Sequence, residues 1–346
     1  MNHKIFFRLG STLCRPHAIV STWITIMLCS VVSPSLATEI TDWKIGKQKE
    51  EEGSEFYTFE PKTSGEGKDF IPVYLLSKPK GEGPFPAIIL NHGGNGSGIN
   101  VRDKHGVKLT KYGGFVTIAC NLTHAMKDVL TKEEFQVKKY ETWKGPGTSE
   151  ANIRRDRMAI EILNGLDYVD NAKLGMWGYS GGGHLTLGFL TTANQKNAIK
   201  AATIFSAGIH PWWEVQRPFN TEFYIRTMSP SREDTKNINV ALLHIHGRLD
   251  TTCISECAEA LEKTMTECGN NAYQLVWLED EGHGTTGAPG VWTKTIRFFR
   301  TSLGLPDIPL DEAKIDPRRS ANEGNGSNSG AKKKSKSKKE TPETNQ

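Results

Sequence analysis

The stretch Gly-Tyr-Ser-Gly-Gly at 178–182 follows an apolar run at 174–177 and precedes a segment compatible with a helix from about Gly183. A sharp turn from strand to helix forces its central residue into a strained backbone conformation, and flanking glycines remove side chains that would collide there. Ser180 would then project its hydroxyl from the top of a sheet, above the positive end of the next helix. The pattern predicts a nucleophilic serine. It also occurs by chance in a chain with 34 glycines, so its surroundings must decide.

Short apolar runs alternate with helical patterns between about 55 and 305. Continuous apolar runs are typical of a parallel sheet covered on both faces, and the clearest helical spacing lies at 150–169. The alternation predicts one domain at 55–305, with a three-layer, mostly parallel α/β sheet and helices on both faces. Two antiparallel strands are expected at 55–60 and 71–76, and the apolar runs follow at 87–90, 115–120, 174–177, 201–205, 240–245 and 273–278.

A second glycine-rich segment, 91–98, follows the apolar run at 87–90. Acyl transfer passes through a tetrahedral oxyanion, which backbone N–H groups stabilise when the main chain approaches closely. We therefore expect an oxyanion hole formed by Gly181 and by the Gly94/Asn95 segment. A phosphate-binding loop is a weaker interpretation, because the segment lacks the Lys-Ser/Thr ending of a P-loop and the spacing of a dinucleotide site.

Two polar segments follow the last two apolar runs: 246–250, which ends in Asp250, and 279–284, which contains His283. Because the carboxyl ends of parallel strands meet at one edge of the sheet, we expect both residues to lie near Ser180. The chain order Ser, Asp, His is the one expected for this arrangement. The sequence therefore predicts a triad in which His283 removes the proton of Ser180 and Asp250 orients the histidine. Such chemistry needs no metal and no organic cofactor, and none is predicted.

Across about 57–299 the chain resembles the α/β-hydrolase superfamily, and within it the catalytic domains of dienelactone hydrolases and prolyl oligopeptidases. The resemblance rests on His-Gly-Gly at 92–94, the stretch at 178–182, His-Gly-Arg-Leu-Asp at 246–250 and Gly-His-Gly at 282–284. It implies the nucleophile, acid, base and oxyanion loop at the positions already assigned.

The chain also departs from both groups. Gly181 and Asn95 stand where prolyl-oligopeptidase relatives usually have an aromatic residue and a proline, and Ser180 replaces the cysteine of dienelactone hydrolases. The β-propeller of the peptidases has no room in this chain. These differences favour hydrolysis of carboxylic esters through an acyl-enzyme. The alternatives are a serine-type peptidase that uses the same triad and a non-catalytic surface-binding protein that keeps the fold. The expected partner is a small ester or a short peptide.

The segment 209–239 is long for a loop and rich in aromatic residues. An insertion of this kind over the strand ends is predicted to form a cap or acyl pocket, in which Tyr179, Trp212 and Trp213 contact the substrate. The alternative is a surface helix packed on the sheet. The remaining histidines near the motifs are predicted to be structural: His92, His184, His244 and His246.

Neither end of the chain is typical of a folded enzyme. Residues 1–37 combine basic residues, a short apolar run and a small-residue end, which is the layout of a secretory signal peptide. The apolar run is shorter than the ~20 residues of a membrane span, so we expect a secreted or periplasmic protein with no transmembrane segment after cleavage. Residues 38–54 are interpreted as an N-terminal linker.

The segment 316–346 consists mainly of Ser, Asn, Gly and Lys and is predicted to be a disordered tail. The formal net charge of +4 comes from this tail and from the leader, so the body is near neutral and a specific nucleic-acid partner is not expected. Weak contact of the tail lysines with anionic surfaces remains a hypothesis.

Four cysteines follow the predicted leader: Cys120, Cys253, Cys257 and Cys268. Export permits disulfides, and a bridge between Cys257 and Cys268 is the simplest expectation because they lie on, and just past, one predicted helix. A zinc site is set aside, because the sequence has no close Cys-x-x-Cys pair and no histidine at ligand spacing.

Overall fold

The computed structural model describes residues 42–48, 50, 53–63, 65, 71–94, 96–122, 150–194, 197–212 and 229–316, all of which belong to one compact unit. The predicted leader, Asn95, Trp213 and the tail beyond Asp316 lie outside the described residues. Within the described ranges, no helix combines the length and the apolar character that a membrane span requires.

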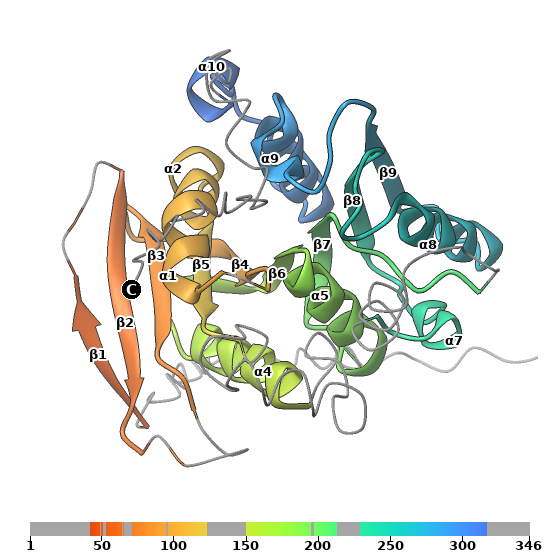
Figure 1. Ribbon diagram of the computed structural model, residues 1–346. Coiled ribbons are helices and arrows are strands. Elements are labelled where there is room, and N and C mark those ends of the chain that lie inside the picture. Colours follow the sequence, from red (N-terminus) through yellow and green to blue (C-terminus); the bar gives the residue numbers. More distant parts are fainter. Residues whose placement is uncertain are drawn as a thin grey trace, which may run out of the picture. The chain divides into compact units, whose positions relative to one another are not determined.

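The described strands form one nine-stranded sheet in the order β1-β2-β3-β5-β4-β6-β7-β8-β9 (Figure 1). From β5 to β9 all neighbours are parallel, whereas β1, β2 and β3 form an antiparallel edge that joins the rest through β5. The strands are β1 (Trp43–Lys47), β2 (Ser54–Pro61), β3 (Tyr74–Pro79), β4 (Phe85–Asn91), β5 (Val116–Cys120), β6 (Val169–Tyr179), β7 (Ile199–Phe205), β8 (Ala241–Gly247) and β9 (Tyr273–Leu278).

Helices cover both faces of this sheet. One apolar core lies between the sheet and the helices α4, α5 and α8, and the other lies between the sheet and α2 and α9 (Figure 1). The predicted three-layer, mostly parallel α/β-hydrolase fold is therefore confirmed. The helices are α1 (Gly98–Val101), the π-helix η2 (Arg102–Gly106), α2 (Val107–Gly113), α4 (Glu150–Asn164), α5 (Gly181–Thr192), α7 (Arg232–Thr235), α8 (Ser255–Glu267), the 3₁₀-helix η4 (Thr285–Gly287), α9 (Val291–Ser302) and α10 (Glu312–Ile315).

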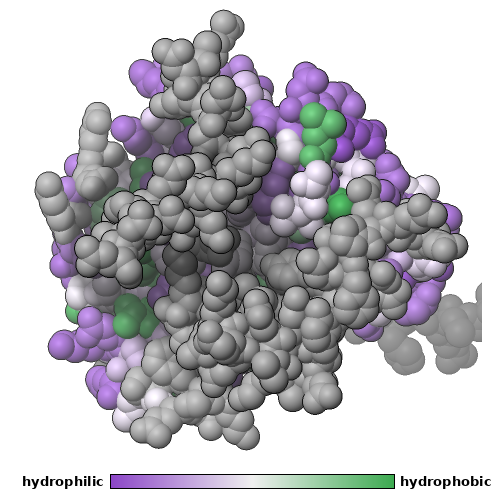
Figure 2. Space-filling view, viewed as in Figure 1, coloured by the Kyte–Doolittle hydropathy of each residue, from purple (hydrophilic) through white to green (hydrophobic). Residues whose placement is uncertain are grey.

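On the face seen in Figure 2, the visible described residues are mostly hydrophilic. Figure 2 shows that hydrophobic residues on this face form small, separate patches between hydrophilic ones. Large apolar side chains with high exposure, such as Leu249 at 62% and Ile99 at 51%, lie far apart in the sequence. Single exposed apolar residues are normal in folded proteins, so they carry no functional argument here.

The structure differs from the predicted elements at both ends of the domain. β1 lies inside the predicted linker and was missed, because an edge strand that is half exposed lacks a continuous apolar run. At the other end, Ile315 is fully buried and Asp316 accepts hydrogen bonds from the first turn of α9, so the packed body continues past the predicted end at 305.

Two predicted elements are shifted. β3 begins at Tyr74 rather than 71 and continues through Ser77 and Lys78, two buried polar residues that interrupt the apolar pattern. α4 ends at Asn164 rather than 169, and its last turn tightens, because the Gly165 N–H donates to the Ile162 carbonyl at 3.1 Å as well as to that of Glu161 at 3.2 Å.

Candidate active site

Ser180 lies at the turn between β6 and α5. Its backbone has φ 53° and ψ −120°, which is a strained conformation for a residue with a side chain. The turn is held because the Ser180 N–H donates to the Phe205 carbonyl at 2.9 Å and the Ser180 carbonyl accepts from the His184 N–H at 3.1 Å. Only 6% of Ser180 is exposed, yet it lines a cavity. The elbow predicted from 178–182 is therefore present.

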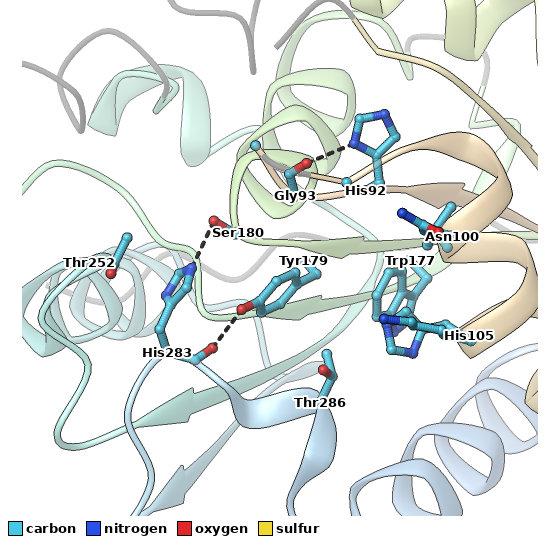
Figure 3. A pocket seen from close by; sticks show the side chains of 14 residues that line it. His92, Gly93, Asn100, His105, Trp177, Tyr179, Ser180, Thr252, His283 and Thr286 are labelled. Carbon is cyan, nitrogen blue, oxygen red and sulfur yellow. Dashed lines mark hydrogen bonds between the residues drawn. The ribbon is translucent and has the colours of Figure 1, made fainter. Parts of the chain in front are cut away.

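The side chains of Ser180, His283 and Asp250 form a continuous hydrogen-bonded chain. Figure 3 shows its first bond, between Ser180 and His283. The distance between His283 Nε2 and Ser180 Oγ is 3.0 Å, and His283 Nδ1 lies 2.8 Å from Asp250 Oδ2. Because a carboxylate accepts hydrogen bonds, the Nδ1 proton faces Asp250 and Nε2 is left to accept from the serine hydroxyl. The structure thus brings together the three residues that the sequence selected from strand ends far apart in the chain.

Asp250 is buried within a tight turn that uses its second oxygen. Oδ1 accepts the backbone N–H groups of Thr252 and Cys253 at 2.8 and 2.9 Å, while Oδ2 faces the histidine. The carboxylate is 4% exposed. These bonds fix the plane of the carboxylate and therefore the plane of the imidazole.

The backbone of His283 is fixed by two hydroxyl groups. Tyr179 Oη and Ser206 Oγ donate to the His283 carbonyl at 2.9 and 3.0 Å. Burial raises the pKa of Tyr179, so its hydroxyl stays protonated and remains a donor. Tyr179 was predicted to contact substrate. It does line the cavity, but its hydroxyl is committed to the loop that carries the base.

The glycine-rich loop after β4 lies directly against the elbow. A side chain at Gly93 would place its Cβ 3.0 Å from Tyr179 Cδ1 and 3.3 Å from Ser180 Cβ, so the main chain can approach only as glycine. His92 braces the loop: its Nε2 accepts from the Leu122 N–H at 2.9 Å, which leaves Nδ1 to donate to the Gly93 carbonyl at 2.8 Å. Burial lowers the pKa of His92 and keeps it neutral.

The predicted oxyanion donors have different outcomes. Gly181 is the first residue of α5, where the backbone N–H is not used by the helix itself. Gly94 lines the same cavity as Ser180. Asn95 lies outside the described residues. Gly181 and Gly94 therefore border the position where an oxyanion would form, and their role stays a prediction.

A row of buried histidines supports the turn that carries Asp250. Because the Cys253 carbonyl can only accept, His246 Nε2 donates to it at 2.8 Å. His246 Nδ1 lies 3.2 Å from both His244 Nε2 and the Ala207 carbonyl oxygen. Tyr273 Oη completes the row at 2.9 Å from His244 Nδ1. Burial lowers the pKa of both histidines, so the row is neutral.

His184 also packs in the interior, where its Nδ1 lies 3.0 Å from the Ser180 carbonyl. Burial lowers its pKa to about 4. The ring therefore braces the elbow backbone and stays neutral at physiological pH.

A cavity of about 540 Å³ opens beside Ser180 and His283. Three of its residues, Asn100, Lys104 and His105, come from the helical segment after the glycine-rich loop and were missed from the sequence, because no motif marks them. The described residues that line it are His92, Gly93, Gly94, Gly96, Asn100, Val101, Lys104, His105, Trp177, Tyr179, Ser180, Thr252, His283 and Thr286.

Trp212, predicted to contact substrate, is not among the described residues that line this cavity. Its ring lies beneath the guanidinium of Arg232, 4.0 Å from the ring centroid, and 5.1 Å from Lys263 Nζ on α8. These cation–π contacts pack the ring against α7 and α8 and favour the packing alternative, while the predicted substrate contact of Trp212 stays a prediction. Trp213 and most of the predicted cap lie outside the described residues.

The expected disulfide is corrected. No disulfide joins any of Cys120, Cys253, Cys257 and Cys268. Cys257 is buried in the first turn of α8, whereas Cys268 is exposed just past its last turn. Eleven residues of helix separate them by roughly 16 Å, far beyond the Cα separation of about 6 Å in a disulfide. Among the described residues, no group of three or more His, Cys, Asp or Glu side chains forms a metal site.

Comparison with known proteins defines the class. Residues 152–304 match the model of the prolyl oligopeptidase family. Dipeptidyl peptidase 4 of Felis catus is 24% identical over 169 residues, which cover 43% of this chain and 21% of that protein. The chain therefore has an α/β-hydrolase fold, and its residues 152–304 are similar to the prolyl oligopeptidase family.

Solved structures extend the comparison beyond peptidases. The acylaminoacyl peptidase of Pyrococcus horikoshii superposes with a TM-score of 0.53 at 18% identity, over 80% of this chain and 44% of that one. A cold-adapted esterase from an Arctic intertidal metagenomic library gives 0.53 at 14% identity, over 75% and 98%. The chain spans about a fifth of the feline peptidase and less than half of the acylaminoacyl peptidase. These structures share the fold of this chain, in which Ser180, His283 and Asp250 lie in one hydrogen-bonded row.

Proposed function

We propose that this protein is a serine hydrolase that cleaves carboxylic esters through an acyl-enzyme formed on Ser180. The observation that carries the proposal is the hydrogen-bonded chain from Ser180 Oγ through His283 to Asp250, with distances of 3.0 and 2.8 Å, at the wall of a cavity. His283 Nε2 takes the serine proton as Oγ attacks the ester carbonyl, and then gives it to the leaving alcohol. A water molecule deprotonated by the same histidine releases the acid.

The tetrahedral intermediate needs donors for its oxyanion. The Gly181 amide at the start of α5 and an amide of the glycine-rich loop near Gly94 are the proposed donors, and each is worth roughly 2.7–4 kcal/mol in a comparable hydrolase. A Cβ added to Gly93 would lie 3.3 Å from Ser180 Cβ, which shows how closely the loop backbone approaches the nucleophile. This close approach supports the assignment because it brings the loop amides to the reacting atoms.

The charge of the cavity favours esters over peptides with a free amino end. An α-ammonium group would be stabilised by a carboxylate, but none lines the cavity among the described residues, and the charged side chain there is that of Lys104. The match at 152–304 keeps a serine-type peptidase as the second candidate. We also propose that the enzyme acts outside the cytoplasm, on the basis of the leader-like residues 1–37.

A labelling and turnover experiment tests this function. A fluorophosphonate probe should modify the wild type but not Ser180→Ala, and Ser180→Ala should lose about 10⁶ in kcat toward short-chain 4-nitrophenyl esters. Aminoacyl and prolyl anilides are assayed in parallel. Faster cleavage of the anilides would reverse the ranking, and activity that survives in Ser180→Ala would exclude Ser180 as the nucleophile. A wild type with neither labelling nor turnover would leave a binding protein as the alternative.

A further inference from the structure

The cavity extends well beyond the reacting atoms. In Figure 3, Ser180 and His283 lie at one end, His105 and Trp177 lie together at the other, and Tyr179 lies between them. All of these residues line the same space of about 540 Å³. The far end is therefore available to a part of the substrate that is several bonds away from the ester carbonyl.

The wall of the far end is built by the π-helix η2. Its residue Gly106 allows the wide turn to approach the sheet, because an added Cβ there would lie 2.8 Å from Leu90 Cδ1 and 2.9 Å from Thr117 Oγ1. The turn holds the His105 ring against Trp292, with centroids 4.9 Å apart, and against Trp177 at 5.0 Å. π-helical turns occur frequently at functional sites.

Two polar atoms at this wall lack partners. Neither His105 Nδ1 nor Trp177 Nε1 has a hydrogen-bond partner among the described residues, although both atoms are buried. Burial and the neighbouring lysines lower the pKa of His105 to about 3, so the ring is neutral. Unsatisfied buried polar groups are rare in folded proteins, and these two belong to residues that line the cavity.

The charge at this wall is positive. Lys104 precedes His105 in η2, and among the described residues that line the cavity it is the one with a formal charge. The Asp250 carboxylate does not line the cavity and is engaged by His283, Thr252 and Cys253. An anion bound beside Lys104 therefore meets no opposing carboxylate among these lining residues.

We propose that Lys104, which lines the cavity beside His105 and Trp177, binds a carboxylate of the substrate, so that the preferred esters carry a negative charge remote from the scissile bond. This inference rests on the proposed ester hydrolysis at Ser180. The carboxylate can belong to the acid part or to the alcohol part of the ester, and the two sources are separated by experiment.

The test compares matched charged and neutral esters. The mono-4-nitrophenyl ester of adipic acid is paired with 4-nitrophenyl heptanoate, and 4-carboxyphenyl butanoate is paired with phenyl butanoate. In at least one pair, the wild type should show a kcat/KM about fivefold or more higher for the anion, equivalent to ~1 kcal/mol for an accessible ion pair. High salt should reduce this ratio, because it screens exposed charges.

Variants of Lys104 assign the preference. In Lys104→Gln the ratio should fall to about one, in Lys104→Glu it should invert, and Lys104→Arg should restore it. Lys111→Gln, on α2 and not a lining residue, is the matched control and should keep the wild-type ratio. Thermal unfolding of each variant checks its folding.

The outcomes separate this inference from the proposed function. Equal use of charged and neutral esters by the wild type, or a preference that survives in Lys104→Gln, overturns the carboxylate site while ester hydrolysis stands. Absence of turnover for all four esters, or turnover that persists in Ser180→Ala, overturns the proposed function itself.

Discussion

Asp250 shows how one buried side chain sets the geometry of a whole site. Its two oxygens have separate tasks: Oδ1 accepts two backbone N–H groups of its own turn, and Oδ2 faces His283 Nδ1. Cys253, whose N–H donates to Oδ1, also accepts from His246 through its carbonyl. The orientation of the imidazole therefore depends on a turn anchored in the core rather than on a flexible side chain.

The substitution Asp250→Asn tests this division. The amide oxygen can keep the two N–H donors, which turns the NH₂ group toward His283 Nδ1 and forces the histidine proton onto Nε2, facing the serine. We expect kcat to fall by about 10⁴, as for the equivalent change in a well-studied triad enzyme. Ester turnover measures the loss. Asp234→Asn, an exposed carboxylate of α7, should behave as wild type. A loss below tenfold for Asp250→Asn would contradict the assigned orientation.

At this scale the sequence predicted the reacting residues better than their neighbours. Ser180, Asp250 and His283 were identifiable because each follows a recognisable strand, and parallel strand ends meet at one edge. Lys104 and His105 were not, because a π-helical turn changes which residues face the cavity and leaves no motif. Trp212 was assigned to substrate from composition, which carries no information about the cation that it packs against.

The elbow between β6 and α5 depends on backbone contact between elements. A Cβ at Gly182 would lie 2.0 Å from the Asn91 carbonyl oxygen and 2.6 Å from that of His92. These atoms belong to the end of β4 and to the loop that borders Ser180, so neither can move without displacing the loop. The glycine is required for this close approach between helix and strand.

Gly182→Ala should therefore destabilise the protein by about 3 kcal/mol or more, the upper range for overpacking. Thermal or urea unfolding measures the change, and ester turnover should fall with it because the loop is displaced. At Gly284 an added Cβ meets nothing within 4 Å, so Gly284→Ala serves as the stability control. Equal melting temperatures for Gly182→Ala and Gly284→Ala would contradict this prediction, because they would show that the backbone around Gly182 shifts to accept the added Cβ at little cost.

Strands with continuous apolar runs could be predicted from the sequence. Strands that alternate apolar and polar or charged residues could not. The parallel strands from β4 to β9 follow the predicted runs, because burial on both faces demands apolar residues throughout. β1 was missed because it pairs on one side alone, with β2, and exposes two lysines. Lysines at a sheet edge discourage pairing with other chains.

The molecule as a whole holds an unusual set of neutral histidines. Burial lowers the pKa of five described histidines, to about 3 for His105 and about 4 for His184. In the unfolded chain each titrates near 6.5, so below that pH the unfolded state binds more protons than the folded one. Asp156 acts in the opposite direction, since burial raises its pKa to about 8, but it is one group against five. The five are His92, His105, His184, His244 and His246.

We therefore expect acid to destabilise the fold. The histidines should contribute their whole stabilising effect to the free energy of unfolding above about pH 6.5. Below that pH, the free energy of unfolding should fall by up to ~1.4 kcal/mol per pH unit for each histidine. Melting temperatures measured between pH 7.5 and 4.5 test this trend, with far-UV and near-UV circular dichroism recorded in the same experiments. A melting temperature that stays constant from pH 7 to 5 would refute it.

Asp316, the last described residue, contacts the start of α9, which in turn supports one wall of the cavity. Its carboxylate accepts the N–H groups of Trp292 and Thr293, which begin α9, and Trp292 is the ring on which His105 stacks. Gly290, the residue before α9, supplies no side-chain cap. During synthesis the last described residue must therefore leave the ribosome before the aromatic support of the substrate site is secured. A nascent chain can form most of its sheet early, but the cavity is completed last.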